Sequence, residues 1–325
     1  MKCIRSEIIG YGHYLPEKVL TNHDLSQMVD TSDEWISTRT GIKSRHVSEN
    51  MTTAEMSVEA SKKALEYAGV SVEDVDLIIV GTLTADNTTP SCAAKVSNLL
   101  GARFGVPAFD VSAACSGFVY ALTVADSMIR LGQVKTALVI GAERLSKVTD
   151  WTDRNTCVLF GDGAGAVILQ AKEGEGSIKD RGILSTHIYS DGSGYTHLYT
   201  TGGVSTTANA GFIFMNGKEV FKSAVGCLSD AAQAVMNDYD ISSEDIDFLV
   251  PHQANIRIIE GVGHKLGLSA EKVVVTVDHH GNTSAASIPL ALSEAIMANK
   301  IKKGNLIVLT AMGAGFTWGG VLIRI

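Results

Sequence analysis

The stretch FDVSAACSGFVYALTVADSMIRLGQVKTALVIGAE, residues 109–143, decides the fold. It opens with an apolar run typical of a strand and passes through a turn of small residues around Cys115. It then continues as a long amphipathic helix and ends in a second apolar run. The order strand, turn, helix, strand is typical of a βαβ unit, whose two strands lie parallel in one sheet.

The same pattern returns once in the second half of the chain. Residues 273–315 contain an apolar run, the turn GNTSAAS, a long helix and the apolar run LIVLTAMG. A second pair, EDVDLIIVGT from Glu73 and EDIDFLVPHQ from Glu244, is separated by 244 − 73 = 171 residues. Alignment of the long helices places Cys115 opposite Ser284, an offset of 284 − 115 = 169 residues. Two matches at nearly one offset favour duplication over chance similarity, and predict two mostly parallel sheets about a pseudo-twofold axis.

Composition bounds the class of protein. The 325 residues are 45% hydrophobic, which is ordinary for a globular chain, and the net charge of −8 argues against nucleic-acid binding. We expect no membrane association, because no apolar run approaches the roughly 18 residues of a bilayer span. The opening MKCIRSEIIGYG lacks the apolar core of a signal peptide, and the five cysteines are odd in number without CxxC spacing. Together these features predict a cytoplasmic protein without disulfides or a metal site.

Three side chains are candidates for the chemistry. Cys115 lies where a strand meets a helix, and helix N-terminal N–H groups stabilise a thiolate, so we expect a lowered thiol pKa. His252 follows the second-half strand at its carboxyl end, where sites in parallel sheets gather, and Asn282 lies in the equivalent of the cysteine turn. His280 is a weaker candidate, which we assign to turn packing. The Gly-, Ser- and Thr-rich segment 189–211 is expected to be a long loop that forms a flap over the site.

Six motifs in order along the chain carry a family resemblance. They are VDTSDEWISTRTGI, DVSAACSGF, DRNTCVLFGDGAGAVIL, PHQANIRI, GNTSAAS and GAGFTWGG. Together they resemble the thiolase-fold β-ketoacyl-[acyl-carrier-protein] synthase III family over nearly the whole chain. The resemblance implies an α/β fold with layered α-β-α-β-α architecture and two duplicated βα halves, residues 1–172 and 173–325.

The resemblance also implies a reaction. The family condenses an acyl-CoA primer with malonyl-acyl carrier protein and releases CoA and CO2, which initiates type II fatty-acid synthesis. Cys115 would form the acyl-enzyme, and His252 and Asn282 would stabilise the enolate left by decarboxylation. The oxyanion hole would use the backbone N–H groups of Cys115 and Ala314, where the family usually has glycine.

Binding residues follow from the same resemblance. Acyl-CoA is a substrate and no cofactor is expected. The positions that match CoA contacts are Thr31, Trp35, Arg39, Arg154, Gly217 and Asn255. Phe160 would wall the acyl pocket. Thr89 would enter it from the partner of a homodimer, and replaces a bulky aromatic found in many members, so longer or branched primers are plausible. Docking of the acidic carrier protein is assigned to Lys222, Arg257 and Lys265.

Other functions are compatible with parts of this pattern. A secondary-metabolite condensing or acyl-transfer enzyme of the same fold would carry the same motifs. A non-catalytic partner subunit typically loses the cysteine, whereas Cys115, His252 and Asn282 are all present here. A papain-like protease also combines cysteine, histidine and asparagine, but the duplicated α/β pattern and the missing local signature around the cysteine argue against it.

Overall fold

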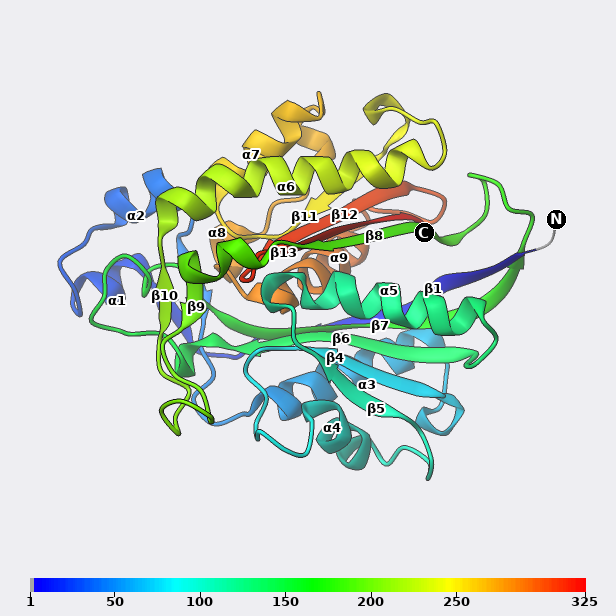
Figure 1. The fold of residues 1–325 in the computed structure, drawn as a ribbon, viewed down its shortest axis with the longest axis horizontal. Coiled ribbons are helices and arrows are strands. Elements are labelled where there is room, and N and C mark those ends of the chain that lie inside the picture. The colour runs from blue at the N-terminus through cyan, green and yellow to red at the C-terminus, as the bar shows by residue number, and fades with distance from the viewer. Residues whose placement is uncertain (1–2) are drawn as a thin grey trace.

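The computed structural model describes residues 3–325, and two sheets form its framework (Figure 1). The first half builds a five-stranded sheet in which only the pairs β6–β4 and β4–β5 are parallel. Its order is β1 (Cys3–Tyr14), β7 (Asp162–Gly174), β6 (Thr136–Arg144), β4 (Leu77–Gly81) and β5 (Ala108–Val111). Strand β5 is therefore an edge strand.

The second half builds a four-stranded sheet with the corresponding topology. Only its first two strands pair in parallel, and the other two pairs are antiparallel. Its order is β11 (Phe248–Pro251), β12 (Leu306–Gly313), β13 (Thr317–Arg324) and β8 (Gly182–Ser190). The strands β8, β13, β12 and β11 thus repeat the places of β1, β7, β6 and β4.

Helices occupy three layers around the two sheets, as Figure 1 shows. The helices α3 (Thr53–Ala68) and α4 (Cys92–Leu100) cover the outer face of the first sheet, and α5 (Gly117–Arg130) and α9 (Ser287–Met297) lie between the sheets. The helices α6 (Gly217–Asn237) and α7 (Ile256–Lys265) cover the second sheet. The predicted layered α-β-α-β-α fold is confirmed. Within residues 3–325, every helix is too short or too polar to span a bilayer.

Helix α3 illustrates how the sequence sets this packing. Thr52 caps its first turn and forms a reciprocal capping box with Glu55, and Gly69 ends it in the left-handed conformation at φ 64°. Glycine in β1 then lets the helix approach closely, because a Cβ atom at Gly10 would lie 2.2 Å from the carbonyl oxygen of Ala64. This close contact therefore fixes α3, which belongs to the outer layer, against the first sheet.

The duplication is present, but its register differs from the predicted one. The helices α5 and α9 begin at residues 117 and 287, so the offset is 287 − 117 = 170 residues. Cys115 consequently lies opposite Ala285, and Ala114 lies opposite Ser284. Ala114 and Ser284 share the left-handed backbone conformation, at φ 47° and 49°. The assignment of Ser284 as the counterpart of Cys115 was therefore wrong by one residue.

The strand expected at 273–277 is reduced to a single bridge between Val273 and Leu249. The side chain of Gln253 takes over the backbone hydrogen bonds of this segment. Its amide donates to the carbonyl of Val274, and its oxygen accepts from the N–H groups of Thr276 and Val277. The side-chain amide of Gln253 thus takes the place of a further strand in the second sheet, and α8 (Val277–His280) follows directly.

Smaller elements gather at one end of the molecule, on the left in Figure 1. The hairpin β2 (Val19–Thr21) and β3 (Ser44–His46) flanks α1 (Asn22–Ser26) and α2 (Asp33–Thr40). The segment 189–211, which was predicted to be a loop, contains the last residues of β8, a 3₁₀ helix at Gly192–His197 and β9 (Leu198–Thr200). Strand β9 pairs with β10 (Ile213–Met215).

An ion pair between α8 and α9 makes stability depend on pH. The hydrogen bond between His279 and Glu294 raises the pKa of His279 to about 9, above the value near 6.5 of an unfolded chain. The contribution of this ion pair to the free energy of unfolding is complete below pH 6.5 and is lost as the pH rises through about 9. Because the two side chains are 42% and 38% exposed, solvent screening limits the gain to about 1 kcal/mol.

We therefore expect the melting temperature to fall by about 2 °C more in the wild type than in Glu294→Gln between pH 6.5 and 9.5. Thermal unfolding followed by circular dichroism measures this difference. Parallel pH profiles for the two proteins would show that the pair does not contribute.

Candidate active site

A cavity of about 700 Å³ brings the predicted catalytic side chains together. Cys115 comes from the first half, and His252 and Asn282 come from the second, and all three line this cavity. Phe160 and Ala314 line it as well. The site is therefore built at the junction of the two halves.

A strained turn holds Cys115 at the base of the cavity. The preceding residue, Ala114, has φ 47°, and a 3₁₀ turn over Ala114–Ser116 leads into α5. The end of β12 presses against this turn, since a Cβ atom at Gly313 would lie 2.6 Å from the backbone nitrogen of Cys115. Glycine at 313 thus allows the segment that carries Ala314 to reach the cysteine.

The thiol does not have the lowered pKa expected from its place before a helix. Burial raises the pKa of Cys115 to about 12, and the nearby charge of Glu143 raises it further. A hydrogen bond with Ser284 and the cysteine's own N–H act in the opposite direction but are weaker. The expectation was wrong because the sulfur, although partly accessible from the cavity, lies deep in the protein. Cys115 is therefore a neutral thiol at neutral pH.

His252 follows β11 and is fixed by a serine of α9. Its Nδ1 lies 2.6 Å from Oγ of Ser287, and the same Oγ accepts from the N–H of Gln253. We assign the Ser287 hydroxyl as the donor to Nδ1, and this assignment places the ring proton on Nε2. Burial lowers the pKa of His252 to about 4. The ring is thus a neutral hydrogen-bond donor at neutral pH.

Asn282 is held by its own backbone and side chain. Its N–H donates to the carbonyl of Leu159, its carbonyl accepts from Gly161, and the intervening Phe160 forms a parallel bridge with it. Its side-chain oxygen accepts from the N–H of Ser284 at 2.9 Å. The amide nitrogen is then the group of Asn282 that can donate into the cavity.

Ala314 lies beside the cysteine turn without backbone strain. It is not among the described residues with positive φ, so alanine is tolerated where the family usually has glycine. Thr317 ties the two segments together, because its hydroxyl lies 2.9 Å from the carbonyl of Ala113 and 3.1 Å from that of Ala314. The backbones of Cys115 and Ala314 therefore belong to one rigid unit.

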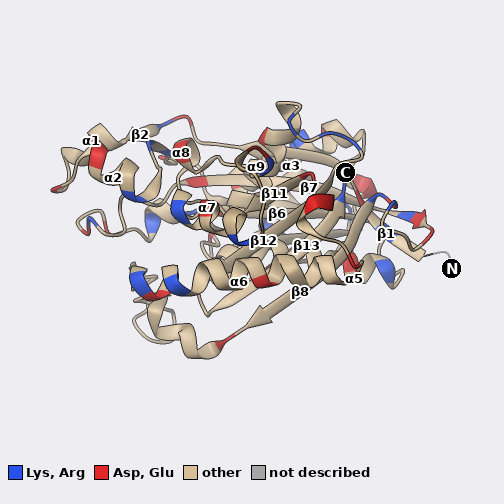
Figure 2. Ribbon diagram, turned by 90° about the horizontal axis from the view of Figure 1, so that it is seen from above, with Lys and Arg blue, Asp and Glu red and all other residues tan. Residues whose placement is uncertain are grey.

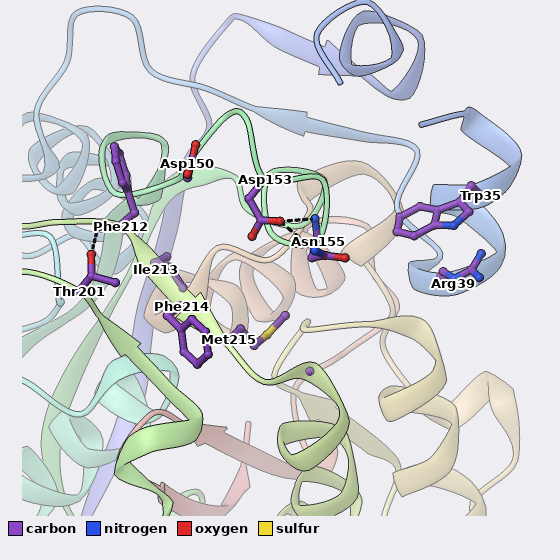
Figure 3. A pocket seen from close by; sticks show the side chains of 11 residues that line it. Trp35, Arg39, Asp150, Asp153, Asn155, Thr201, Phe212, Ile213, Phe214 and Met215 are labelled. Carbon is purple, nitrogen blue, oxygen red and sulfur yellow. Dashed lines mark hydrogen bonds between the residues drawn. The ribbon is translucent and has the colours of Figure 1, made fainter. Parts of the chain in front are cut away.

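The cavity opens into an outer cleft of about 690 Å³, shown in Figure 3. Trp35 and Arg39 of α2 lie on one side of the cleft, and Phe214 and Met215 of β10 lie across from them. The guanidinium carbons of Arg39 and Arg154 each lie 4.5 Å from the Trp35 ring centre. This cluster joins an aromatic surface to two cations, which suits a phosphorylated nucleotide.

Of the other predicted CoA contacts, Gly217 and Asn255 line the cavities and Thr31 does not. Gly217, the first residue of α6, lines both cavities. Asn255 lines the inner cavity, caps α7 and donates to the carbonyl of Arg39 at 3.0 Å. Thr31 precedes α2, and its buried hydroxyl has no hydrogen-bond partner within the described chain.

The structure does not bring Thr89 or the three predicted docking residues into the cavity. Thr89 is exposed, and Lys222, Arg257 and Lys265 lie exposed on α6 and α7. Figure 2 shows cations on the first turns of these helices, at the end of the molecule that carries α1 and α2. Lys265 is 3.2 Å from Asp230, whereas Arg257 lies over the Phe221 ring at 5.3 Å. Arg257 is therefore the cation of the three that is held against an aromatic ring.

Sequence reasoning missed the serine behind His252 and the side chains that wall the cavity. Ser287 was quoted only as part of a small-residue turn, although a serine next to a helix start can hold a histidine. Tyr195, Leu198 and Tyr199 line the cavity from the segment 189–211. Aromatic residues in a Gly- and Ser-rich stretch were the available signal for this second group.

Comparison with known proteins places these features in a family. A model of the C-terminal part of 3-oxoacyl-[acyl-carrier-protein] synthase III matches residues 236–325, and a second model of 3-oxoacyl-[acyl-carrier-protein] synthase III matches residues 109–192. A model of stage V sporulation protein AD matches residues 37–149. The β-ketoacyl-[acyl-carrier-protein] synthase III of Paramagnetospirillum magneticum AMB-1 is 56% identical over 99% of both chains. That of Rhodospirillum centenum SW is also 56% identical, again over 99% of both chains. The crystal structure of 3-oxoacyl-[acyl-carrier-protein] synthase III from Aquifex aeolicus VF5 superimposes with a TM-score of 0.92 and 49% identity, covering 98% of this chain and all of the other.

Proposed function

The chain belongs to the 3-oxoacyl-[acyl-carrier-protein] synthase III family, and from this premise we propose how it condenses an acyl-CoA primer with malonyl-acyl carrier protein. It is a condensing acyltransferase whose reaction begins type II fatty-acid synthesis. One observation carries the assignment of its site, namely the single cavity that Cys115, His252 and Asn282 line together.

Acylation comes first. The sulfur of Cys115 attacks the thioester carbonyl of acyl-CoA, and CoA leaves. The oxygen of the tetrahedral intermediate accepts hydrogen bonds from the N–H groups of Cys115 and Ala314. The close approach at Gly313 supports this pair of donors, because it brings the two backbone segments within contact of each other.

Condensation follows on the acyl-enzyme. Loss of CO2 from the malonyl group leaves an enolate, which accepts hydrogen bonds from Nε2 of His252 and the amide of Asn282. A neutral imidazole suits this role, because the step needs a donor and no base has to remove a carbon-bound proton. The carbanion then attacks the acyl group on Cys115 and gives the β-ketoacyl product.

The outer cleft receives the nucleotide of CoA. Trp35 and Arg154 are assigned to sandwich the adenine, and Arg39 offers positive charge near the nucleotide. Thr31 is assigned to the nucleotide end by the family resemblance alone, and Gly217 and Asn255 flank the pantetheine arm where the outer cleft meets the inner cavity. Acyl-CoA is a substrate in this scheme, and the chemistry needs no cofactor.

The exposed edge of the first sheet supports a homodimer. Strand β5 is half-buried and has one free edge, and Phe104 beside it is fully exposed. A second copy paired at this edge would cover both features and carry Thr89 toward the partner's acyl pocket, beside Phe160. Location in the cytoplasm agrees with the five cysteines, all of which are free in residues 3–325.

Docking of the carrier protein is assigned to Lys222, Arg257 and Lys265. For Arg257→Glu we expect the KM for malonyl-acyl carrier protein to rise about tenfold while acylation by acyl-CoA is unchanged, because the carrier is acidic and does not take part in the first half-reaction. Steady-state kinetics at two salt concentrations measure this, and the wild-type KM should itself rise with salt.

Lys303→Glu is the matched charge reversal. Lys303 is exposed in the turn before β12, about 25 Å along that strand from the site. Equal effects of the two reversals on the carrier KM would contradict a localised docking surface.

Intact-mass spectrometry tests the proposed function directly. The protein is mixed with acyl-CoA thioesters of increasing length and branching, and then malonyl-acyl carrier protein is added. We expect the mass of one acyl group to appear on the protein and to disappear with formation of β-ketoacyl carrier protein. Failure of every acyl-CoA to load would overturn the proposal.

A further inference from the structure

A buried carboxylate lies behind the cysteine turn, and the reaction steps above do not use it. Glu143 is the next-to-last residue of β6 and has no exposed surface. Thr82 and Thr84 donate to it through their hydroxyls, and Leu83 donates through its N–H. Three residues of one loop are thus arranged around one carboxylate.

Ser284 connects this carboxylate to the reactive sulfur. Its hydroxyl donates to Oε1 of Glu143 at 3.2 Å, and Ser284 lines the same cavity as Cys115 and acts on the pKa of its thiol. The side chain is held by its backbone, which adopts φ 49° and donates its N–H to Asn282. The Ser284 hydroxyl therefore lies between the thiol of Cys115 and the carboxylate of Glu143.

The single hydroxyl proton of Ser284 limits which neighbour it can donate to. Ser284 cannot donate to Cys115 and Glu143 at the same time. In the resting protein the thiol carries its proton, so it donates to Ser284, and Ser284 donates to the carboxylate. When the thiol gives its proton to the Ser284 oxygen, Ser284 passes its original proton to Glu143. The proton that Ser284 has received then points to the sulfur.

Another base for Cys115 is not evident among the groups that face it. With the Ser287 hydroxyl assigned as the donor to Nδ1, His252 carries its ring proton on Nε2 and is a donor toward the cavity. Arg144 follows Glu143 but directs its guanidinium to the carbonyls of Ser48 and Glu49. The titratable groups that face Glu143 are the thiols of Cys115, before α5, and of Cys92, at the start of α4.

We propose that Glu143, acting through Ser284, accepts the Cys115 proton during acylation and returns it when the acyl group leaves the sulfur. This inference rests on the proposed function. As the bond from sulfur to the acyl carbon forms, the thiol proton moves to Ser284 and the serine proton moves to Glu143. CoA departs as a thiolate, which takes a proton from water.

The second half-reaction closes the cycle. When the carbanion attacks the acyl-enzyme, the bond from the acyl carbon to sulfur breaks and Cys115 leaves as a thiolate. The proton on Glu143 then returns through Ser284 to the sulfur. The net reaction consumes one proton, which is the one that CoA takes from water, and Glu143 ends as it began.

The acidity of Glu143 supports this assignment. Burial raises the pKa of this carboxyl to about 7, in spite of its four hydrogen-bond donors. A proton acceptor with a pKa near the working pH is ionised often enough to act and basic enough to hold the proton. Among the described carboxylates, this one is linked by one hydroxyl to the nucleophile.

The pH profile of acylation tests the relay. Single-turnover acylation by acyl-CoA is stopped by acid and followed by intact mass between pH 5.5 and 9.5. In the wild type we expect the rate to rise with pH and to level off above about pH 7. In Glu143→Gln we expect a rate about 100-fold lower at pH 7 that continues to rise through pH 9, because hydroxide must replace the relay.

Three further measurements separate the relay from a structural role. Ser284→Ala, which keeps the carboxylate, should lose the same plateau, and the double variant should be no slower than either single one. Thr82→Val removes one donor from the carboxylate and should shift the plateau to higher pH without lowering it. Iodoacetamide should alkylate Cys115 of Glu143→Gln more slowly than that of the wild type at pH 7, because the thiol must lose its proton in this reaction too, without any CoA to bind.

The possible results decide between the claims. A wild-type plateau retained in Glu143→Gln, or a loss that is equal at every pH, overturns the relay. A wild-type protein that no acyl-CoA can load overturns the proposed function together with the relay. Glutamine keeps the size and an oxygen acceptor of the original side chain, and Ser284→Ala provides an independent test if Glu143→Gln does not fold.

Discussion

Replacement of Cys115 by serine is expected to lower acylation by acyl-CoA about ten-thousand-fold or more, to the level of the uncatalysed background. The serine hydroxyl fits the space of the thiol, so the turn over Ala114–Ser116 and the cavity are retained. A hydroxyl is a much weaker acid and nucleophile than a thiol, and no other cysteine lines the cavity. Intact mass after mixing with acyl-CoA measures the loss.

Cys227→Ser is the matched control. Cys227 lies on α6, partly buried and outside the cavity lining, so this variant should load at the wild-type rate. Peptide mapping of the loaded wild type should find the acyl group on Cys115. An acylated Cys115→Ser protein, or an acyl group on a different residue, would disprove the assignment of the nucleophile.

Replacement of His252 by alanine is expected to slow condensation by 100- to 1000-fold, about 3–4 kcal/mol of transition-state stabilisation, while acylation is retained. The physical reason is the loss of the Nε2–H donor to the enolate oxygen. Since the pKa of His252 is about 4, the ring stays neutral above pH 5, and its donor role should persist across the neutral range. Single-turnover condensation from preloaded acyl-enzyme isolates this step.

Ser287→Ala is the graded comparison for His252. It keeps the imidazole but removes the hydroxyl that lies 2.6 Å from Nδ1, so condensation should fall by less than in His252→Ala. If His252→Ala stopped acylation as fully as condensation, the histidine would be required to activate the thiol. That result would contradict both its assignment as an enolate donor and the proton path through Glu143.

The fold was predictable where local pattern and packing agree. The strand, turn and helix around Cys115 carry apolar periodicity, small residues and a clear helix length, and the structure has β5, a 3₁₀ turn and α5 there. The second-half strand at 273–277 failed because Gln253 was not recognised as a substitute for a neighbouring strand. A side chain that bonds backbone twenty residues away leaves no periodic signal.

The residues that form the site were easier to predict from the sequence than the pKa values of their side chains. Cys115, His252 and Asn282 could be chosen because each follows a strand or opens a helix in one of the two related halves. The acidity of the thiol could not, because it depends on how deeply the two halves enclose the sulfur. Glu143 also passed unnoticed at the end of TALVIGAE, although a charge at the end of a fully apolar strand marks a position that must be paired.

The two left-handed turns, at Ala114 before α5 and at Ser284 before α9, have different roles in the site. The turn before α5 and the turn before α9 touch, since a Cβ atom at Gly117 would lie 3.3 Å from that of Ala285. Ala114 and Ser284 occupy equivalent places in them and share one backbone conformation. The two turns differ in their side chains, so that one carries the thiol of Cys115 and the other carries the hydroxyl of Ser284. Ser284→Ala, which places the same residue in both turns, would therefore lower the reactivity of Cys115 while the backbone of the turn is retained.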